Sequence, residues 1–187
     1  MSRPASPTLL ATALLALALA GCGTPGQPLS MTITPAEALQ VRGWVPDALK
    51  DQVGVLPVMG GAETGRWWGS MVSAKAVQNA LEDSLYAVGM KPAAPQPAPR
   101  FELKSALVLL QQPPLAAAGV TVDVTMYYRL TDTHTGRIVY ERRIANQQDA
   151  GLGDALLSPS ERLRIANERA LQANIGLLLR DLVTLRP

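Results

Sequence analysis

Two neighbouring stretches of the chain alternate between apolar and polar residues with a period of two, which is typical of strands with one buried face. From Val120 to Leu130 every second residue is apolar or aromatic, and the residues between them are mostly polar. Residues 137–144 form the next such stretch, after a turn over residues 132–136. The pattern predicts two strands joined as an antiparallel hairpin.

Two further stretches are predicted to be core strands, and a third is a candidate edge strand outside the core order. Residues 101–110 alternate at first and are then apolar at every position, so both faces are expected to be covered at that end. Residues 52–58 form a β-branched run that ends in a glycine turn, and residues 31–34 alternate briefly, which predicts a short edge strand. Residues 35–44 are expected to be irregular or to form one helical turn.

Two stretches have helical periodicity. In residues 73–88 the apolar side chains recur every three or four positions, with Ser73 as the N-cap and Gly89 after the C-terminus. The second helix begins at a predicted capping box, Ser158 to Glu161, and runs to about residue 182. Its apolar stripe is expected to comprise Leu163, Ala166, Ala170, Leu171, Ala173, Ile175, Leu177 and Leu178.

The predicted order is therefore β-α-β-β-β-α. It indicates an α+β fold with a largely antiparallel sheet of about four strands and two helices packed on one face. The proline-rich residues 91–100 are expected to be an extended connector, and residues 146–157 show no period.

The N-terminus has the pattern of a secretory signal. Residues 9–20 are almost entirely Leu and Ala, a run too short to span a bilayer. The next residues include Gly21 and Cys22, and the sequence Leu-Ala-Gly-Cys matches the lipobox of bacterial lipoproteins. We expect a signal peptide at residues 1–21 that is cleaved between Gly21 and Cys22, a flexible tether at 22–30, and one domain at 31–187.

Cys22 is the only cysteine, so the chain cannot form an intramolecular disulfide. By the lipobox match, its sulfur is expected to carry a diacylglycerol and its amino group an acyl chain such as palmitate, which together give stable membrane anchoring. Residue 23 is Gly and not Asp. By resemblance to enterobacterial sorting rules, this favours the periplasmic face of the outer membrane. No other cofactor is expected.

Charge and motifs argue against several classes of function. The formal net charge of +2 falls by one when Arg3 leaves with the signal, and no basic run indicates nucleic-acid binding. His134 is the only histidine, so a typical zinc site is not expected. It lies in the predicted hairpin turn, where a solvated residue is favoured over a general base paired with Asp132. We therefore expect neither a metal site nor an enzyme.

Two apolar regions are candidate partner-binding surfaces. Trp67 and Trp68 stand between glycines, and tryptophan is enriched at binding hot spots and membrane interfaces. Their alternative role, which Trp44 shares, is to cover the end of the sheet. The second region is the apolar patch of Val108-Leu109-Leu110 and Pro113-Pro114-Leu115, whose alternative role is burial under the first helix.

Several segments together resemble an uncharacterised family of proteobacterial lipoproteins, over most of residues 50–182. They are Arg66-Trp67-Trp68-Gly69-Ser70, residues 80–85, residues 124–132 with Thr135-Gly136, and residues 161–170. The layout is also similar to that of transport-auxiliary lipoproteins of envelope lipid-transport systems. Members of such families are sometimes labelled UDP-N-acetylglucosamine acyltransferases. That enzyme class has hexapeptide repeats and a catalytic histidine, and this chain has neither.

The resemblance implies a non-enzymatic, lipid-anchored accessory protein that binds an envelope protein, in lipid transport or envelope assembly. The sheet edge or the Trp67-Trp68 loop would make the contact. The alternatives are a carrier of a lipid or another apolar ligand, which needs an enclosed apolar pocket, and a hydrolase or transferase, which needs a cleft with converging polar groups.

Overall fold

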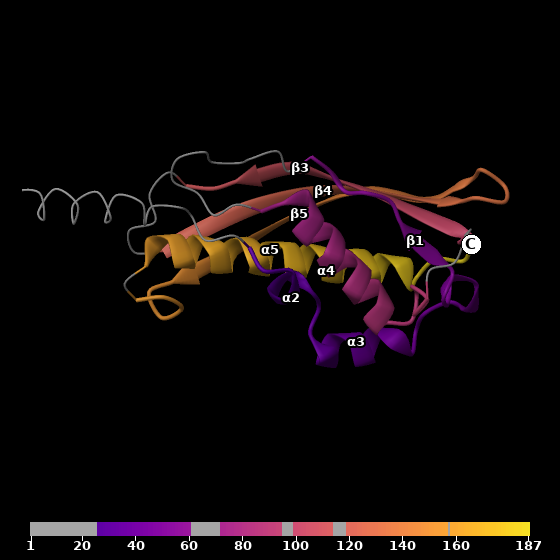
Figure 1. Ribbon diagram of the computed structural model, residues 1–187, viewed down its shortest axis with the longest axis horizontal. Helices are drawn as coiled ribbons and strands as arrows, with labels where there is room; N and C mark the ends of the chain where they lie inside the picture. The colour runs from indigo at the N-terminus through magenta and orange to yellow at the C-terminus, as the bar shows by residue number, and fades with distance from the viewer. Residues whose placement is uncertain (1–25, 61–71, 95–98, 114–118, 157) are drawn as a thin grey trace, which may run out of the picture.

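The computed structural model describes residues 26–60, 72–94, 99–113, 119–156 and 158–187. These residues form three layers, seen in Figure 1 with the sheet uppermost. Helices α4 (Ala74–Ala87) and α5 (Pro159–Leu182) pack against one face of the sheet. Helices α2 (Pro28–Met31) and α3 (Pro35–Arg42), followed by a 3-10 turn at Asp47–Leu49, lie on the far side of α4 and α5 and contact both. The two helices on one face confirm the prediction, whereas the third layer was not predicted.

The sheet has five strands: β1 (Val53–Val55), β2 (Met59–Gly60), β3 (Phe101–Gln111), β4 (Gly119–Asp132) and β5 (Ile138–Gly151). Their order is β1-β3-β4-β5, and β2 also pairs with β3. The β3–β4 and β4–β5 pairs are antiparallel, while β1 and β2 run parallel to β3. The α+β class and the largely antiparallel sheet are confirmed, with one strand more than expected.

The core lies between the sheet and the two helices. On β4, every second residue from Val120 to Asp132 is buried, as the alternation predicts. Helix α4 buries its predicted stripe and has the predicted cap, because Ser73 accepts a hydrogen bond from the Ala76 N–H. Helix α5 buries most of its predicted stripe, but Ala173 and Leu177 are only half-buried at its margin.

The edge strand predicted at residues 31–34 is wrong. Met31 ends α2, and the Ile33 N–H donates to the buried Ser84 hydroxyl on α4 at 3.2 Å, so it is not available for a strand ladder. Thr34 and Glu37 form a capping box that begins α3, which is longer than the single turn expected. The local hydrogen-bonding of Thr34 therefore outweighs the short alternation.

The run at residues 52–58 forms one short strand, β1, and the glycine turn predicted after it contains a second, β2. The chain leaves the sheet after Val55 and returns at Met59 to pair with β3 again. Gly60 has a φ of 78°, and a Cβ at this position would lie 2.4 Å from the Leu107 carbonyl oxygen. Only glycine fits this close approach of the two backbones.

Strand β5 continues to Gly151, beyond the predicted end at residue 144. Its second half is mostly polar, and there Asn146 faces α5 through hydrogen bonds. Asn146 donates to the Ala170 carbonyl at 2.9 Å and accepts from Asn174 at 2.6 Å. Asn174 also accepts from the Tyr128 hydroxyl at 2.9 Å and donates to the Ile144 carbonyl at 2.9 Å. This buried network joins α5 to β4 and β5.

Replacing Asn174 by Ala is expected to destabilise the fold by about 2 kcal/mol, because the buried Tyr128 hydroxyl and Asn146 each lose a partner. The melting temperature should fall by about 4–8 °C for a domain of this size. Urea unfolding followed by circular dichroism measures the change. The control is Arg180→Ala on the exposed side of α5, which should change the free energy of unfolding by less than about 0.5 kcal/mol. Equal effects of the two substitutions would contradict the network.

Candidate functional site

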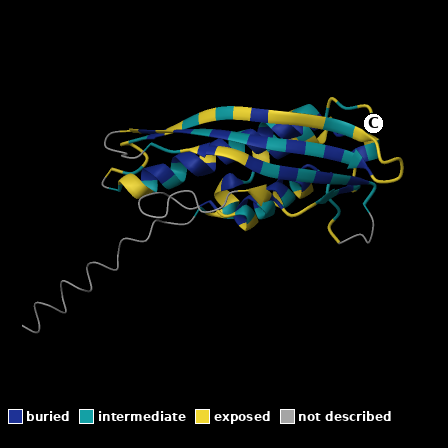
Figure 2. Cartoon of the chain, turned by 90° about the horizontal axis from the view of Figure 1, so that it is seen from above, coloured by how far each residue is buried: buried dark blue, intermediate teal, exposed yellow. Residues whose placement is uncertain are grey.

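One face of the sheet is not covered by any described helix, and we call it the open face. Figure 2 looks onto it and shows buried and exposed positions alternating along the strands. The registers of β3, β4 and β5 bring together side chains that are partly or fully exposed here. They are Glu102, Lys104, Ala106 and Leu109 on β3, Thr121, Asp123, Thr125, Tyr127 and Arg129 on β4, and Glu141, Arg143, Ala145, Gln147 and Asp149 on β5.

An apolar band crosses the open face. Val108 and Leu109 are 51% and 45% exposed, which is unusual for large apolar side chains on a strand. Leu109 lies opposite Thr125, and Thr125 lies opposite Ala145 on β5, so the band extends across three strands. We use "apolar band" for Val108, Leu109 and Ala145 together with the methyl-bearing Thr125 that lies between Leu109 and Ala145. Such a strip on an otherwise polar face is typical of a protein contact.

A β-bulge at Val108 creates this exposure. The pairing of β3 with β4 shifts between Leu107 and Leu109, so one extra residue stands on β3. Leu110 then lies opposite Val124 and is buried in the core. The expectation that Leu110 lies on a partner surface is corrected: Leu110 packs in the core, whereas Val108 and Leu109 of the same predicted patch are exposed.

An ionic cluster lies beside the apolar band. Glu141 accepts hydrogen bonds from the Tyr127 hydroxyl and, at 2.8 Å, from Arg129. The bond from Tyr127, then that from Arg129, lowers the pKa of Glu141, and the same carboxylate raises the pKa of Tyr127. Glu141 is therefore ionised and its charge is balanced by Arg129. The cluster holds the side chains of Tyr127, Arg129 and Glu141 in fixed orientations, and its two charges cancel.

Strand β5 lies at the end of the sheet order and pairs with β4 alone among the described strands. Its backbone is partly occupied by side chains of α5. Asn174 donates to the Ile144 carbonyl at 2.9 Å and Arg169 to the Asp149 carbonyl at 3.2 Å. Helix side chains and charged residues such as Arg142 and Arg143 protect this edge from unspecific pairing. The open face therefore offers a larger free contact surface than the edge.

Several predicted site residues lie outside the described residues. They are Gly21 and Cys22, the tryptophans Trp67 and Trp68, and Leu115. Their roles stay predictions. Trp44 is described, and it is 76% exposed directly after α3, so it does not cover the end of the sheet.

His134 occupies the hairpin turn as an exposed residue. The buried carboxylate beside it organises the turn: Asp132 accepts from the backbone N–H groups of His134 and Thr135 and from Arg100. Burial raises the pKa of Asp132, but the hydrogen bonds from His134, Arg100 and Thr135 outweigh it, so the pKa lies below its ordinary value. This is the arrangement of a structural turn, in which the carboxylate is directed at backbone groups.

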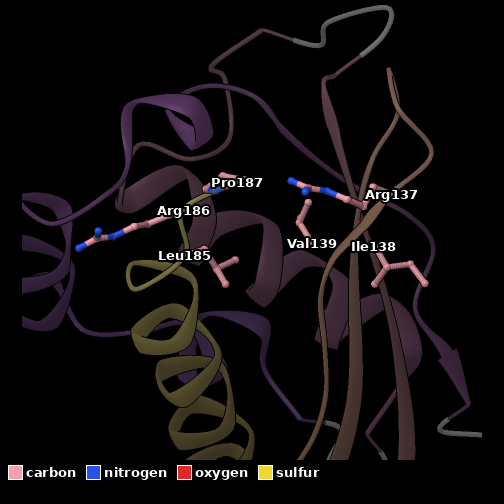
Figure 3. Close-up of a pocket in the computed structure, with 6 residues that line it drawn as sticks. All are labelled: Arg137, Ile138, Val139, Leu185, Arg186 and Pro187. Carbon is pink, nitrogen blue, oxygen red and sulfur yellow. The ribbon is translucent and has the colours of Figure 1, made fainter.

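Two cavities bear on the carrier hypothesis. The larger, about 250 Å³, lies where the start of β5 meets the C-terminal residues 185–187, and Arg137 and Arg186 are among its lining residues (Figure 3). The other, about 210 Å³, lies between β1 and the chain after α4. Both are open to solvent and smaller than the roughly 300–1,000 Å³ of typical small-molecule sites. Neither has the enclosed apolar volume that a lipid carrier needs.

Across the described ranges, no group of three or more His, Cys, Asp or Glu side chains is placed to hold a metal ion. The same part of the chain contains no helix with the length and hydropathy needed to cross a bilayer.

The fold is shared with solved bacterial structures. A candidate lipoprotein from Caulobacter crescentus is 15% identical, with 78% of this chain and 93% of that chain covered and a TM-score of 0.51. A Xanthomonas campestris protein of the DUF330 family is 13% identical, with coverage of 75% and 90% and a TM-score of 0.53. No protein-family model and no curated protein sequence matches the chain. At these identities the likeness establishes the fold, and it is consistent with the expected resemblance to proteobacterial lipoproteins.

Leu109 and Leu110 are neighbours with opposite environments, which gives a direct test of the bulge. Leu110→Ala is expected to lower the free energy of unfolding by about 2–4 kcal/mol because it leaves a cavity in the core. The matched change Leu109→Ala should alter it by less than about 0.5 kcal/mol. Chemical denaturation of both variants measures the difference. A larger loss for Leu109→Ala than for Leu110→Ala would show that the register is shifted by one residue.

Proposed function

We propose that this protein is a lipid-anchored envelope lipoprotein that acts as a non-enzymatic binding module on the periplasmic face of the outer membrane. Two observations support the class. The sequence around Cys22 matches a lipobox, and the fold is shared with a candidate lipoprotein from Caulobacter crescentus. An accessory role in lipid transport or envelope assembly fits a domain held close to a membrane and presenting a surface for a partner.

The observation that carries the binding role is the apolar band on the open face. Val108 and Leu109 are exposed at the β-bulge of β3, beside the hydrogen-bonded cluster of Arg129, Tyr127 and Glu141. Apolar centres rimmed by polar groups are typical of protein interfaces. We favour a protein partner over a small ligand because the face is a broad sheet surface, whereas the two cavities described above, which lie among the described residues, are small and open.

A non-enzymatic role is favoured by the placement of the polar side chains. His134 is exposed at the tip of the hairpin, and its acidic neighbour Asp132 is engaged with backbone N–H groups and Arg100. Two other ion pairs have structural roles: Arg164 pairs with Glu168 within α5, and Arg142 on β5 pairs with Asp181 on α5.

Anchoring is tested on Cys22. The full chain, expressed in a Gram-negative host with an alkyne analogue of palmitate, should become labelled, and its intact mass should begin at Cys22 with three acyl chains. Cys22→Ala should abolish the label completely, because the chain has no other thiol. Labelling that persists in Cys22→Ala, or an unlabelled wild-type chain, would overturn the anchored class.

Partner binding is tested by a photo-crosslinking amino acid placed at Leu109 in the lipoprotein in intact cells. We expect one discrete covalent adduct with an envelope protein. The matched control places the same probe at Arg180, which is exposed on α5 on the opposite side of the sheet, and should give no such adduct. The absence of an adduct at Leu109, or equal adducts at both positions, would contradict the open face as the contact.

A further inference from the structure

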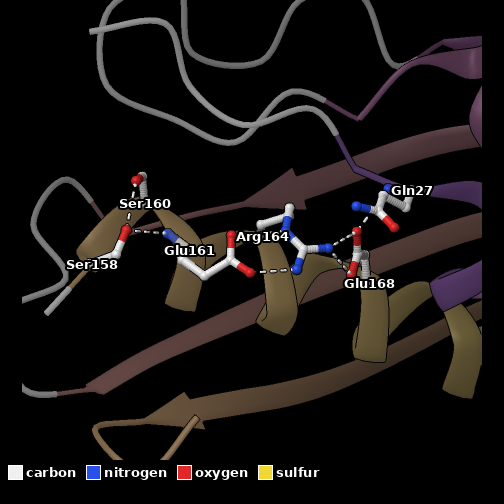
Figure 4. Close-up of polar contacts among 6 residues, drawn as sticks. All are labelled: Gln27, Ser158, Ser160, Glu161, Arg164 and Glu168. Carbon is white, nitrogen blue, oxygen red and sulfur yellow. Dashed lines mark hydrogen bonds and ion pairs between the residues drawn. The ribbon is translucent and has the colours of Figure 1, made fainter. Parts of the chain in front are cut away.

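The first described residues are fixed to the middle of the molecule. The Gln27 N–H donates to Glu168 on α5 at 2.7 Å, and the Arg164 guanidinium holds both oxygens of this buried carboxylate at 2.6 Å (Figure 4). A second bond joins Gln172 on α5 to the Thr32 carbonyl at 2.6 Å. Helix α2 is therefore held against α5 by the residues on either side of it.

This attachment limits how far the domain can lie from an anchor at Cys22. Gln27 follows Cys22 by five positions in the sequence. A fully extended chain gains at most about 3.6 Å per residue, so Gln27 lies within roughly 18 Å of the Cys22 backbone in any conformation. With acyl chains on Cys22, Gln27 and the start of α2 are therefore held near the lipid headgroups, which brings the α2–α3 layer within reach of the membrane surface.

The same layer exposes large apolar side chains. Leu29 is 80% exposed, Leu39 is 74% and Trp44 is 76%, the three highest values among the large apolar side chains of the described residues. All three belong to the first stretch of the described chain, on the layer farthest from the sheet. Burial of leucine side chains at the boundary between headgroups and acyl chains is favourable, and tryptophan is enriched at the membrane–water interface.

The charges on this layer are compatible with a lipid surface. Glu37 is engaged in the α3 capping box, and Asp47 is paired with Lys50 at 2.6 Å. Arg42, in the last turn of α3, is exposed between Leu39 and Trp44 in sequence. A cation beside apolar side chains suits a bilayer that contains anionic headgroups.

We infer that the α2–α3 layer lies on the membrane surface, with Leu29, Leu39 and Trp44 inserted into the interfacial region of the bilayer. The inference rests on the proposed anchor at Cys22. Tethering raises the effective concentration of these side chains at the lipid, so weak contacts suffice to orient the domain. The anchor retains the protein at the membrane, and the three side chains determine which side faces it.

The test uses the full acylated protein in vesicles of phosphatidylethanolamine and phosphatidylglycerol, with and without brominated acyl chains. In a Trp67→Phe/Trp68→Phe background, Trp44 is the single tryptophan and is excited selectively over the tyrosines. We expect its emission to shift to shorter wavelength and to be quenched about twofold by the brominated lipid, as for an interfacial tryptophan. Adding Leu29→Ser and Leu39→Ser should reduce the quenching.

The matched control carries Trp44→Phe and Leu109→Trp in the same background, which moves the single tryptophan to the open face. Its emission should not be quenched. Quenching of Trp44 no stronger than that of the Leu109→Trp probe would overturn the inference and would leave a protein as the occupant of this layer.

Intact mass of the same preparation separates this inference from the proposed anchor. An acylated protein with unquenched Trp44 refutes the membrane-facing layer alone. A protein without acyl chains refutes the anchor, and the inference falls with it.

Discussion

The packing of α5 across β4 and β5 is the interaction on which the rest of the structure depends. Ala166 and Ala170 are fully buried, and their small side chains let the helix approach the sheet closely. Asn174 then fixes the position of the helix along the strands through Tyr128 and Asn146. A purely apolar interface tolerates sliding, whereas a fully hydrogen-bonded buried network stabilises one register. Burial strongly raises the pKa of Tyr128, so its hydroxyl remains a donor to Asn174.

The same helix organises the layers on its other side. Through Glu168 and Gln172 it binds the backbone on either side of α2, and α4 packs alongside it. Arg164 bridges Glu161 and Glu168 on the helix surface, which keeps the Glu168 carboxylate oriented toward Gln27. The capping box expected at Ser158 and Glu161 is present only in part. Ser158 accepts from the Glu161 N–H, but the Glu161 carboxylate binds Arg164 instead.

The sequence predicted the fold correctly where a regular pattern of apolar residues continued over ten or more positions. The alternation of residues 120–130 and the three- and four-residue spacing of residues 73–88 identified β4 and α4 with ends within two residues of those observed. The second half of β5 was not predictable in this way because Asn146 faces α5 through hydrogen bonds, and its pattern carries no apolar period. The prediction of an edge strand at residues 31–34 was wrong because the alternation there is brief. The Ile33 N–H donates instead to Ser84, more than fifty positions away, and Thr34 caps α3. The apolar patch predicted at residues 108–110 is divided in the structure: Val108 and Leu109 are exposed, whereas Leu110 is buried, since a bulge at Val108 reverses the alternation after it.

The bond between Gln27 and Glu168 joins residues 141 positions apart, and the Thr32–Gln172 bond is almost as distant. A chain that emerges N-terminus first therefore presents Gln27 long before its acceptor exists. Neither bond can form before α5 has been made. The two bonds therefore close the domain only once its last helix is in place, and they join the beginning of the described chain to its end.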